Sequence, residues 1–233
     1  KPSFMAPIEV LCTDCEQKSS CFKQLELEEL EFANNSKVQI HYKKGETIAK
    51  QGSFVTHVLY VKQGLVKVYK ELQDNTNLIY SVLPQGSFVG LSNLYTRDTF
   101  QFSVAALSHS AICSIDRNVL EQLVMSNGSF ANSIIETVNR ETHHLRSKMI
   151  TLTHKPMKGR LSDTLIELSR DVFGTLAFPY KLSRNDLAEF SGMSMMSVVR
   201  TMQDFIKNGY VEEQEGKIII LDMEALERMS QGN

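Results

Sequence analysis

Short apolar runs separated by turn residues fill the chain from about residue 37 to residue 115. Residues 38–42 and 65–69 alternate apolar and polar side chains, and residues 57–61 form another short run, with Gly52 and Gly64 between the runs. A period of two is typical of half-buried strands, and many short strands at this spacing favour an antiparallel sandwich or barrel. The sequence therefore predicts a β-rich domain in the first half of the chain.

A long helical pattern follows Asn127 and Gly128. Residues 129–153 contain neither glycine nor proline, and their apolar positions lie mostly three, four or seven apart, which marks one face of a helix. Such a helix has about seven turns, more than a lone surface helix needs, so its apolar stripe is expected to pair with a second copy of itself. The alternative is a helix that lies on its own β-domain. The predicted dimer contacts are Phe130, Ile134, Val138, Leu145, Met149 and Leu152.

A helix-turn-helix is predicted near the carboxyl end of the chain. Ser183 and Ser194 are each suited to cap the start of a helix, and Gly192 lies between the two helices, where a left-handed backbone is needed. Two helices joined by such a turn are typical of DNA-binding proteins, in which the second helix lies in the major groove. Residues 210–221 indicate a hairpin wing, and Asp222 can cap a last short helix. The alternative is a helical fragment that serves only as a packing domain.

Side chains around the second helix supply the candidate DNA contacts. Arg200 can read guanine through paired donors to O6 and N7. Hydroxyls, backbone amides and a cation at helix starts can hold phosphates, whereas methionines offer only apolar contacts, such as with a thymine methyl group. For the two methionines the alternative is packing against the wing. The candidate contacts are Ser183, Arg184, Ser194, Met195, Met196, Ser197, Arg200 and Thr201.

Composition and charge limit the classes of protein that fit. The 233 residues are 42% hydrophobic and 22% charged, which is ordinary for a globular protein. Residues 1–154 carry 15 basic and 15 acidic side chains and the rest carry 10 and 12, so DNA binding rests on local geometry and not on a basic domain. No apolar run is long enough for a membrane helix, and residues 1–7 lack the core of a secretory signal. The chain is expected to be cytoplasmic.

Three runs in the β-rich region resemble a known family. Lys44-Gly45-Glu46, Gln51-Gly52 and residues 59–68 are similar to the effector β-roll of the CRP/FNR transcription regulators, and the long helix and helix-turn-helix follow in that family's order. The resemblance implies an α+β fold with an N-terminal antiparallel β-roll of the cyclic-nucleotide-binding-domain type, a long dimerisation helix and a C-terminal winged helix-turn-helix. It divides the chain into a cysteine-containing leader at 1–35, the roll at 36–128, the dimerisation helix at 129–154 and the DNA-binding domain at 155–233.

The resemblance also implies partners. Members of the family are homodimers that place two recognition helices on a pseudo-palindromic operator in double-stranded DNA, with half-sites ~34 Å apart. RNA polymerase is a further candidate partner, and no contact with a membrane is expected. The FNR branch reads DNA with a glutamate, a serine and an arginine, and Met196, Val199 and Arg200 stand at those places here. The operator sequence of that branch therefore cannot be carried over.

The resemblance separates two kinds of effector. In the cAMP-binding branch, a glycine–glutamate pair and an arginine–serine pair hold the ribose and the cyclic phosphate. Residues 86–90 read GSFVG here and residues 100–101 read FQ, so neither the carboxylate nor the arginine is present. Because an unpaired buried phosphate is costly, cAMP is not expected to bind.

The cysteines are similar to those of the FNR branch. Cys12, Cys15 and Cys21 have the spacing of its amino-terminal ligand run, and Cys113 matches its distant fourth ligand. Four thiolates can hold a 4Fe-4S cluster, one for each iron, so the resemblance implies a sensor of oxygen, nitric oxide or redox state. A zinc site would accept the same four thiolates, and four free reduced cysteines are the plain alternative.

Other interpretations change the sensor or the class of protein. A haem-bound gas or a small molecule in the roll is the second candidate effector, and His41, His57 and His109 are candidate haem ligands. His143 and His144 are neighbours on a helix and point apart, so they make a poor metal pair. An enzyme is not expected, because the chain has no nucleophile elbow, no Walker loop and no His-Glu-x-x-His motif.

Overall fold

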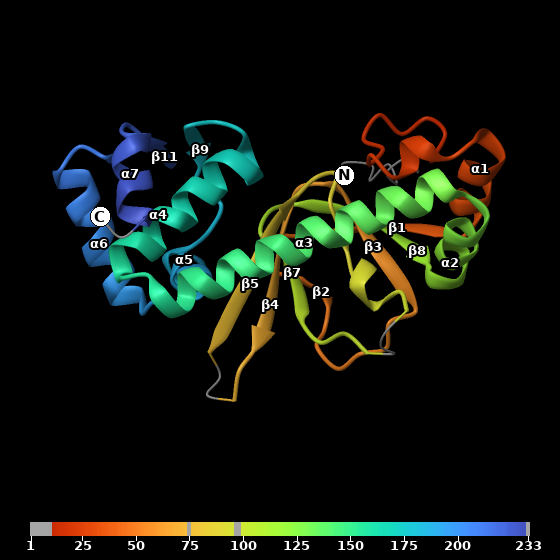
Figure 1. Ribbon diagram of the computed structural model, residues 1–233, viewed down its shortest axis with the longest axis horizontal. Coiled ribbons are helices and arrows are strands. Elements are labelled where there is room, and N and C mark those ends of the chain that lie inside the picture. Colours follow the sequence, from red (N-terminus) through yellow and green to blue (C-terminus); the bar gives the residue numbers. More distant parts are fainter. Residues whose placement is uncertain (1–10, 74–75, 96–98, 232–233) are drawn as a thin grey trace, which may run out of the picture.

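The computed structural model describes residues 11–73, 76–95 and 99–231 of the chain. One long helix, α3 (Gly128–His154), runs along most of the molecule, with the β-rich domain and the leader at its amino end and the C-terminal domain at its carboxyl end (Figure 1). The first ten residues of the predicted leader, including the amino end for which no signal is expected, lie outside the described residues. The order of the parts is that of the predicted α+β fold.

Two antiparallel sheets form the β-rich domain, called the roll below. Their strand orders are β1-β8-β3-β6 and β2-β7-β4-β5. The chain passes from one sheet to the other at Gly64, where φ is +96° and an added Cβ would lie 2.3 Å from Oγ of Ser110, so only glycine fits this turn. The strands are β1 (Lys37–Tyr42), β2 (Thr47–Ala49), β3 (His57–Gln63), β4 (Leu65–Glu71), β5 (Asn77–Pro84), β6 (Phe88–Val89), β7 (Ser103–Ala106) and β8 (Ser110–Asp116), with a 3-10 turn η2 (Leu91–Asn93) between β6 and β7.

The leader packs on the sheet that contains β3 and β8. Its η1 turn (Phe22–Gln24) and α1 helix (Leu27–Asn35) bury apolar side chains, together with α2 (Arg117–Ser126) and the start of α3, in one cluster that we call the leader core. Asp116 caps α2 by accepting a hydrogen bond from the backbone N–H of Asn118 (2.8 Å). The leader core includes Cys12, Cys21, Phe22, Leu25, Val58, Tyr60, Cys113, Ile115, Phe130 and Ile134.

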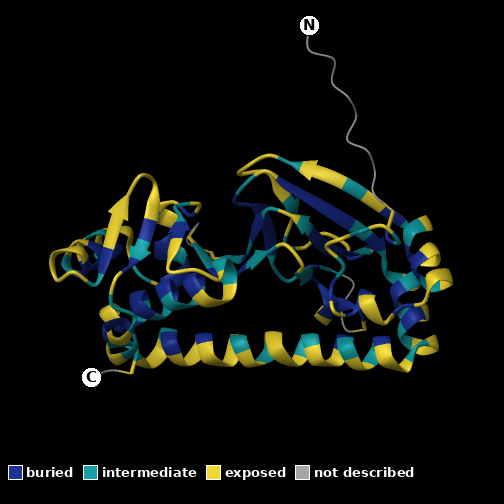
Figure 2. Cartoon of the chain, turned by 90° about the horizontal axis from the view of Figure 1, so that it is seen from above, coloured by how far each residue is buried: buried dark blue, intermediate teal, exposed yellow. Residues whose placement is uncertain are grey.

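The two halves of α3 are covered by different parts of the chain. Asn127 caps its start by accepting from the backbone N–H of Phe130 (2.9 Å). Phe130 and Ile134 then enter the leader core, whereas Lys148 and Thr151 are buried near the carboxyl end. The side of α3 that faces away from the roll is exposed along its length (Figure 2).

The C-terminal domain, called the head below, contains the helix pair and the wing. Its three-stranded sheet has the order β10-β11-β9, so a third strand joins the predicted hairpin. That strand is only three residues long and includes Pro179, which hides it from any search for alternation. The head consists of α4 (Met157–Glu167), a π-helical turn η3 (Leu168–Phe173), β9 (Ala177–Pro179), α5 (Arg184–Ser191), α6 (Met195–Lys207), β10 (Val211–Gln214), β11 (Lys217–Ile220) and α7 (Met223–Ser230). Among the described helices, none combines the length and the apolar character that a membrane span requires.

Candidate functional site

Two serines fix the starts of α5 and α6. Oγ of Ser183 accepts a hydrogen bond from the backbone N–H of Asp186 (3.0 Å), and Oγ of Ser194 accepts one from the N–H of Ser197 (3.1 Å). Between the helices, Gly192 has a φ of +62°, and a Cβ there would lie 2.5 Å from Cδ2 of Leu152 on α3. The turn requires a residue without a side chain, and it sets the helix pair against the end of α3.

The first turns of α6 present an open surface. Met195 is 54% exposed and Met196 is 73% exposed, so neither is buried against the wing. Arg200 and both capping serines are exposed as well. An exposed helix start with capping hydroxyls can hold a phosphate, and an arginine one turn further along can reach a base edge.

Three of the predicted contacts are placed differently. Thr201 is only 8% exposed and lies on the inner side of α6, so this placement removes it from the surface that could meet DNA. Arg184 donates a hydrogen bond to Glu213 on the wing (2.8 Å), and its guanidinium lies over the ring of Tyr180. Ser197 is half-buried and is tied to Ser194 by its hydroxyl as well as its N–H.

Three of the four cysteines line one small cavity. Cys12 and Cys15 reach it from the leader and Cys113 reaches it from β8. The cavity holds about 30 Å³, room for one or two water molecules. The other residues that line it are Lys18, Ser19, Phe22, Lys37, Tyr60, Lys62 and Ile115.

The fourth thiol points toward α3. Sγ of Cys21 lies 3.5 Å from the backbone oxygen of Ser133, to which it donates, and 3.5 Å from Oγ1 of Thr137. Cys21 is completely buried. Its thiol therefore ties the leader to the long helix and does not join the other three.

Burial and nearby lysines act on the thiols in opposite directions. Burial raises the pKa of Cys12 and raises that of Cys113 to about 11, and the ammonium groups of Lys37 and Lys62 oppose both shifts. Such thiols are protonated at neutral pH, so a metal must displace protons to bind them. The lysines favour the thiolates that result.

The donor set suits an iron–sulfur cluster in kind and in number. Four thiols are what a cubane cluster takes from a protein; Cys12, Cys21 and Cys113 belong to the leader core, and Cys15 lines the cavity beside it. The arrangement of the four thiols differs from that of a site that holds a cluster, because Cys21 bonds to α3 and the cavity is small. Within the part of the chain that the structure describes, no three His, Cys, Asp or Glu side chains are arranged to hold a metal ion. Binding a cluster requires Cys21 to turn away from α3 and the leader to open.

The histidines considered as haem ligands lie at the surface of the roll. The rings of His41 and His109 are 5.8 Å apart, and both residues are exposed. His57 is half-buried and hydrogen-bonds with Oγ1 of Thr56 (2.8 Å). These positions do not gather the three side chains around one centre.

A much larger cavity, of about 960 Å³, lies between the roll, α3 and the head. Polar groups converge on it from two sides. Arg140 and Glu141 reach it from α3, and burial raises the pKa of the Glu141 carboxyl. On the opposite side Asn93 is 4% exposed, and its Nδ2 has no hydrogen-bond partner among the described residues. The cavity has the size and the mixed lining of a small-molecule site.

The predicted dimer contacts divide into two groups. Phe130 and Ile134 are buried in the leader core of their own chain, and Val138 packs against that core. These side chains are used inside one chain, because the amino half of α3 forms a wall of its own leader core. Leu145 and Met149 are exposed.

The exposed stripe on α3 keeps the predicted Leu145, Met149 and Leu152 and adds isoleucines outside the predicted set. Ile135 and Ile150, which the sequence analysis did not select, are both more than half exposed. Ile135, Leu145, Met149 and the half-buried Leu152 recur at intervals close to those of a heptad. The face that a second helix could cover is thus rotated away from Phe130.

Sequence reasoning missed the charged groups beside both candidate sites. Lys37 and Lys62 come from β1 and β3, and only the folded sheet brings them to the cysteines. In the same way, the fold brings Lys67 on β4 of the roll into contact with Asp186 of the head. No local pattern marks such residues, because the sequence separations are long.

Known proteins match the chain over nearly its whole length. Residues 39–127 match the cyclic nucleotide-binding domain family and residues 159–229 match the Crp-like helix-turn-helix domain family. The transcriptional activator protein FnrA of Stutzerimonas stutzeri is 24% identical over 91% of this chain and 88% of its own length. The transcriptional activator protein anr of Pseudomonas aeruginosa is 25% identical over the same shares. Among solved structures, FixK2 from Bradyrhizobium japonicum has a TM-score of 0.76 at 20% identity, covering 83% of this chain and 96% of that one.

These matches confirm the predicted fold class and the resemblance. The two domain families together cover more than half of the chain, in the order of a cyclic-nucleotide-binding-type roll followed by a helix-turn-helix head. The relatives are transcription regulators, and the family is not enzymatic. The chain belongs to the CRP/FNR family of DNA-binding transcription regulators.

Proposed function

We propose that this regulator is a cytoplasmic sensor of oxygen, nitric oxide or redox state that acts through a 4Fe-4S cluster on Cys12, Cys15, Cys21 and Cys113. The observation that carries the proposal is the convergence of three thiols on one cavity from distant parts of the sequence. When bound, such a cluster supplies iron centres that oxygen and nitric oxide attack. The burial of Cys12, Cys21 and Cys113 keeps bulk water away from these thiols, and Lys37 and Lys62 offset part of the negative charge of the thiolates of Cys12 and Cys113.

Cys21 connects the proposed site with the long helix. Its thiol now contacts Ser133 and Thr137, which lie on the amino half of α3. If Cys21 serves as the fourth ligand, it must give up these contacts. The leader then holds α3 differently in the two states, and only such a difference can shift the population between them.

On DNA, the proposed contacts are the exposed groups of the head. Ser183 and Ser194 hold phosphates at two helix starts, Arg200 reads a base, and Met195 and Met196 make apolar contacts. Arg184 joins them if it shares its guanidinium between Glu213 and a phosphate.

The proposed homodimer pairs the exposed stripe of α3 with its copy. Ile135, Leu145 and Met149 are exposed on α3, and the half-buried Leu152 extends the stripe to the point where the helix contacts Gly192 of the head. A solvent-exposed apolar stripe of this length is typical of a helix that pairs. Two such chains present two heads to a pseudo-palindromic operator.

Anaerobic reconstitution tests the sensor. Protein treated with ferrous iron and sulfide without oxygen should bind about four irons and four sulfides per chain and sediment at twice the mass of one chain. Cys113→Ser and Cys21→Ser should each lose most of this iron. Ser114→Ala is the matched control, because Ser114 is the neighbour of Cys113 on β8 and should leave the iron content unchanged.

Two outcomes contradict the cluster. Fewer than one iron per chain after reconstitution rejects it outright. About one tightly bound zinc per chain that depends on the same cysteines replaces it with a structural metal site.

The large cavity supports a second candidate function. An effector of this class is a small molecule with polar groups, bound between the roll and α3 and satisfying the unpaired amide of Asn93. A haem would reveal itself by its absorption in the purified protein. If the chain binds no iron, thermal-shift screening of small polar molecules against the wild type and Asn93→Leu tests this alternative.

A further inference from the structure

The head and the roll share one apolar core. Ile79 and Val82 on β5 are buried in the same cluster as Leu187 and Phe190 on α5. The head is therefore docked on the sheet β2-β7-β4-β5 and does not hang from α3 alone. A junction with a buried apolar centre can hold one orientation of two domains.

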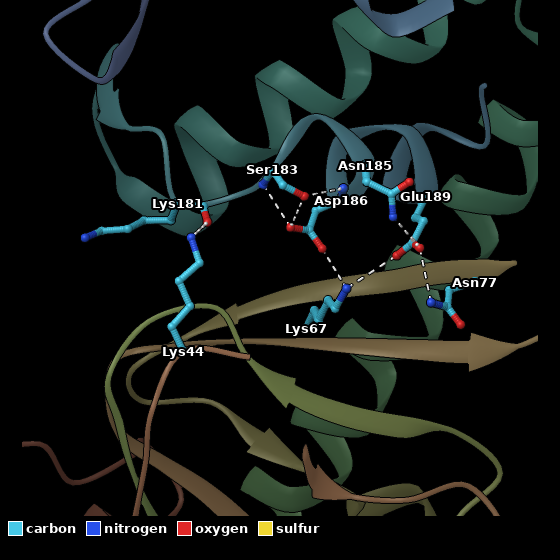
Figure 3. A network of polar contacts seen from close by, with 8 residues as sticks. All are labelled: Lys44, Lys67, Asn77, Lys181, Ser183, Asn185, Asp186 and Glu189. Carbon is cyan, nitrogen blue, oxygen red and sulfur yellow. Dashed lines mark hydrogen bonds and ion pairs between the residues drawn. The ribbon is translucent and has the colours of Figure 1, made fainter. Parts of the chain in front are cut away.

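A polar network closes one side of this junction. Nζ of Lys67 on β4 lies 2.6 Å from Oδ1 of Asp186 and 3.4 Å from Oε2 of Glu189, both on α5 (Figure 3). Nδ2 of Asn77 on β5 donates to Glu189 (3.1 Å), and Lys44 donates to the backbone oxygen of Lys181 (3.1 Å).

Little water reaches the central ion pair. The side chains of Lys67, Asp186 and Glu189 are only 16%, 11% and 12% exposed. An ion pair at the surface contributes little free energy, so it does little to hold two domains in one orientation. A pair this shielded resists separation, because breaking it leaves a buried charge uncompensated. Without the lysine, two carboxylates one turn apart on α5 would lose the cation that they share.

One of the two carboxylates that Lys67 contacts, that of Asp186, also holds the start of α5. Oδ1 of Asp186 accepts from Lys67, while Oδ2 accepts from the backbone N–H of Ser183 (2.8 Å) and from its hydroxyl (2.7 Å). Asp186 is thus the third residue of the capping box that starts α5. A residue of the roll holds the end of α5 at which a phosphate is expected.

The contact leaves the reading surface free. Asp186 and Glu189 lie one turn apart on α5 and face the roll, whereas Met195, Met196 and Arg200 on α6 are exposed. An autoinhibitory contact would cover α6. The observed contact is with α5, the other helix of the pair.

We propose that Lys67 is a positioning residue for DNA binding: from the roll, through Asp186 and Glu189, it holds the helix-turn-helix in the orientation that presents α6 to the major groove. A head held in this way has little orientational freedom to lose when it binds. A head released from the roll must lose that freedom on the DNA, which weakens binding without removing any contact to DNA.

The test measures affinity for a duplex that the wild-type protein itself selects from a random-sequence library. Lys67→Met should bind this duplex about tenfold more weakly, within the usual range of coupling between two sites. Lys70→Met is the matched control, because Lys70 lies on the same strand and donates to the backbone oxygen of Gln101 inside the roll (2.8 Å). Lys67→Arg keeps the cation and should recover most of the affinity.

The dependence on salt separates positioning from direct contact. Because Lys67 touches no phosphate in this proposal, the slope of log affinity against log salt should stay that of the wild type, while a lost phosphate contact lowers the slope by about one. A lowered slope, or an affinity of Lys67→Met equal to or above that of the wild type, overturns the proposal. If Lys67→Met fails to fold, as judged by its thermal midpoint, Glu189→Gln removes the second carboxylate and should weaken binding in the same direction; unchanged affinity there also overturns it.

Discussion

The two sheets of the roll support two junctions of different character. The sheet β2-β7-β4-β5 carries the head through a shared apolar core that Lys67 and two carboxylates close on one side. The sheet β1-β8-β3-β6 carries the leader through the leader core, whose polar groups include thiols and the hydroxyl of Tyr60. The first junction has a shielded ion pair beside its apolar core, whereas the second has thiols and a hydroxyl, with the ammonium groups of Lys37 and Lys62 nearby.

This difference assigns a different task to each junction. A shielded ion pair has one geometry of low energy, so the head junction is suited to hold an orientation. Thiols form weak hydrogen bonds and strong bonds to metals, so the leader junction is suited to exchange partners. The helix α3 touches the leader core with its amino half and is buried near the head with its carboxyl half, and it can carry a change from one junction to the other.

Removing one buried isoleucine from each junction should give the largest effects. Ile79 is completely buried in the core shared with the head, and Ile115 is 2% exposed in the leader core. Ile79→Ala and Ile115→Ala should each lower the free energy of unfolding by about 2–5 kcal/mol, because each leaves a cavity. Denaturant unfolding measures this loss.

The functional effects of this pair should differ although the losses of stability are similar. At a temperature where both variants are folded, Ile79→Ala should weaken binding to the selected duplex and keep the metal content of reconstituted protein. Ile115→Ala should lower the metal content first. Equal effects of both variants on DNA binding and on metal would mean that the junctions are not separate.

The helix pair of the head could be predicted because its signals are local. Ser183, Gly192 and Ser194 act on backbone groups a few residues away, and the structure has each of them in the role that its position indicates. The order of the domains could be predicted from local signals as well. The spacing of apolar residues changes from every second position in the roll to a helical spacing in α3.

The rest of the two sites could not be predicted, because it depends on residues far apart in sequence. The apolar stripe of α3 alone does not tell which positions the leader covers, so the sequence places Phe130 and Ile134, which are buried, on the same stripe as the exposed Met149. The contact of Cys21 with Thr137 spans 116 residues and that of Lys67 with Asp186 spans 119. Neither leaves a mark on the local sequence.

Acidification should destabilise the head junction by less than the loss of a buried isoleucine does. Burial alone would raise the pKa of Asp186, but its hydrogen bonds with Lys67 and Ser183 outweigh burial and lower the pKa. The stabilisation is therefore complete above the ordinary carboxyl pKa of about 3.9 and is lost as the pH falls through the lower pKa of the folded state. Lys67 has a raised pKa, because its partners outweigh its burial, so its contribution persists up to at least about pH 10.4.

Hydrogen exchange at single amides can follow this loss. After correction for the intrinsic rate, protection in β5 and α5 should fall below about pH 4, while protection in β3 and β8 at the leader junction should not. Asp186→Asn should remove the dependence. The protonation of Glu167 in α4 should have the opposite effect on stability. Burial raises the pKa of this carboxyl, so its protonation at low pH favours the folded state. Loss of protection that begins in β3 and β8 would reverse the assignment of the charged junction.

The smallest expected effect comes from the hydroxyl of Tyr60, which ties the leader to the roll. Tyr60 donates a hydrogen bond to the backbone oxygen of Gln17, while its ring packs against Phe88 with centroids 4.9 Å apart. Tyr60→Phe keeps the ring and removes the bond, and water can reach the exposed Gln17, so the loss should be about 1 kcal/mol. Amides of residues 15–23 should exchange faster, and those of α5 should not change. Tyr69→Phe, on the sheet that carries the head, is the matched control and should leave the leader as it was. If Tyr60→Phe instead loosens α5 as much as the leader, the roll transmits strain between its two sheets directly, and α3 is not needed as the connection.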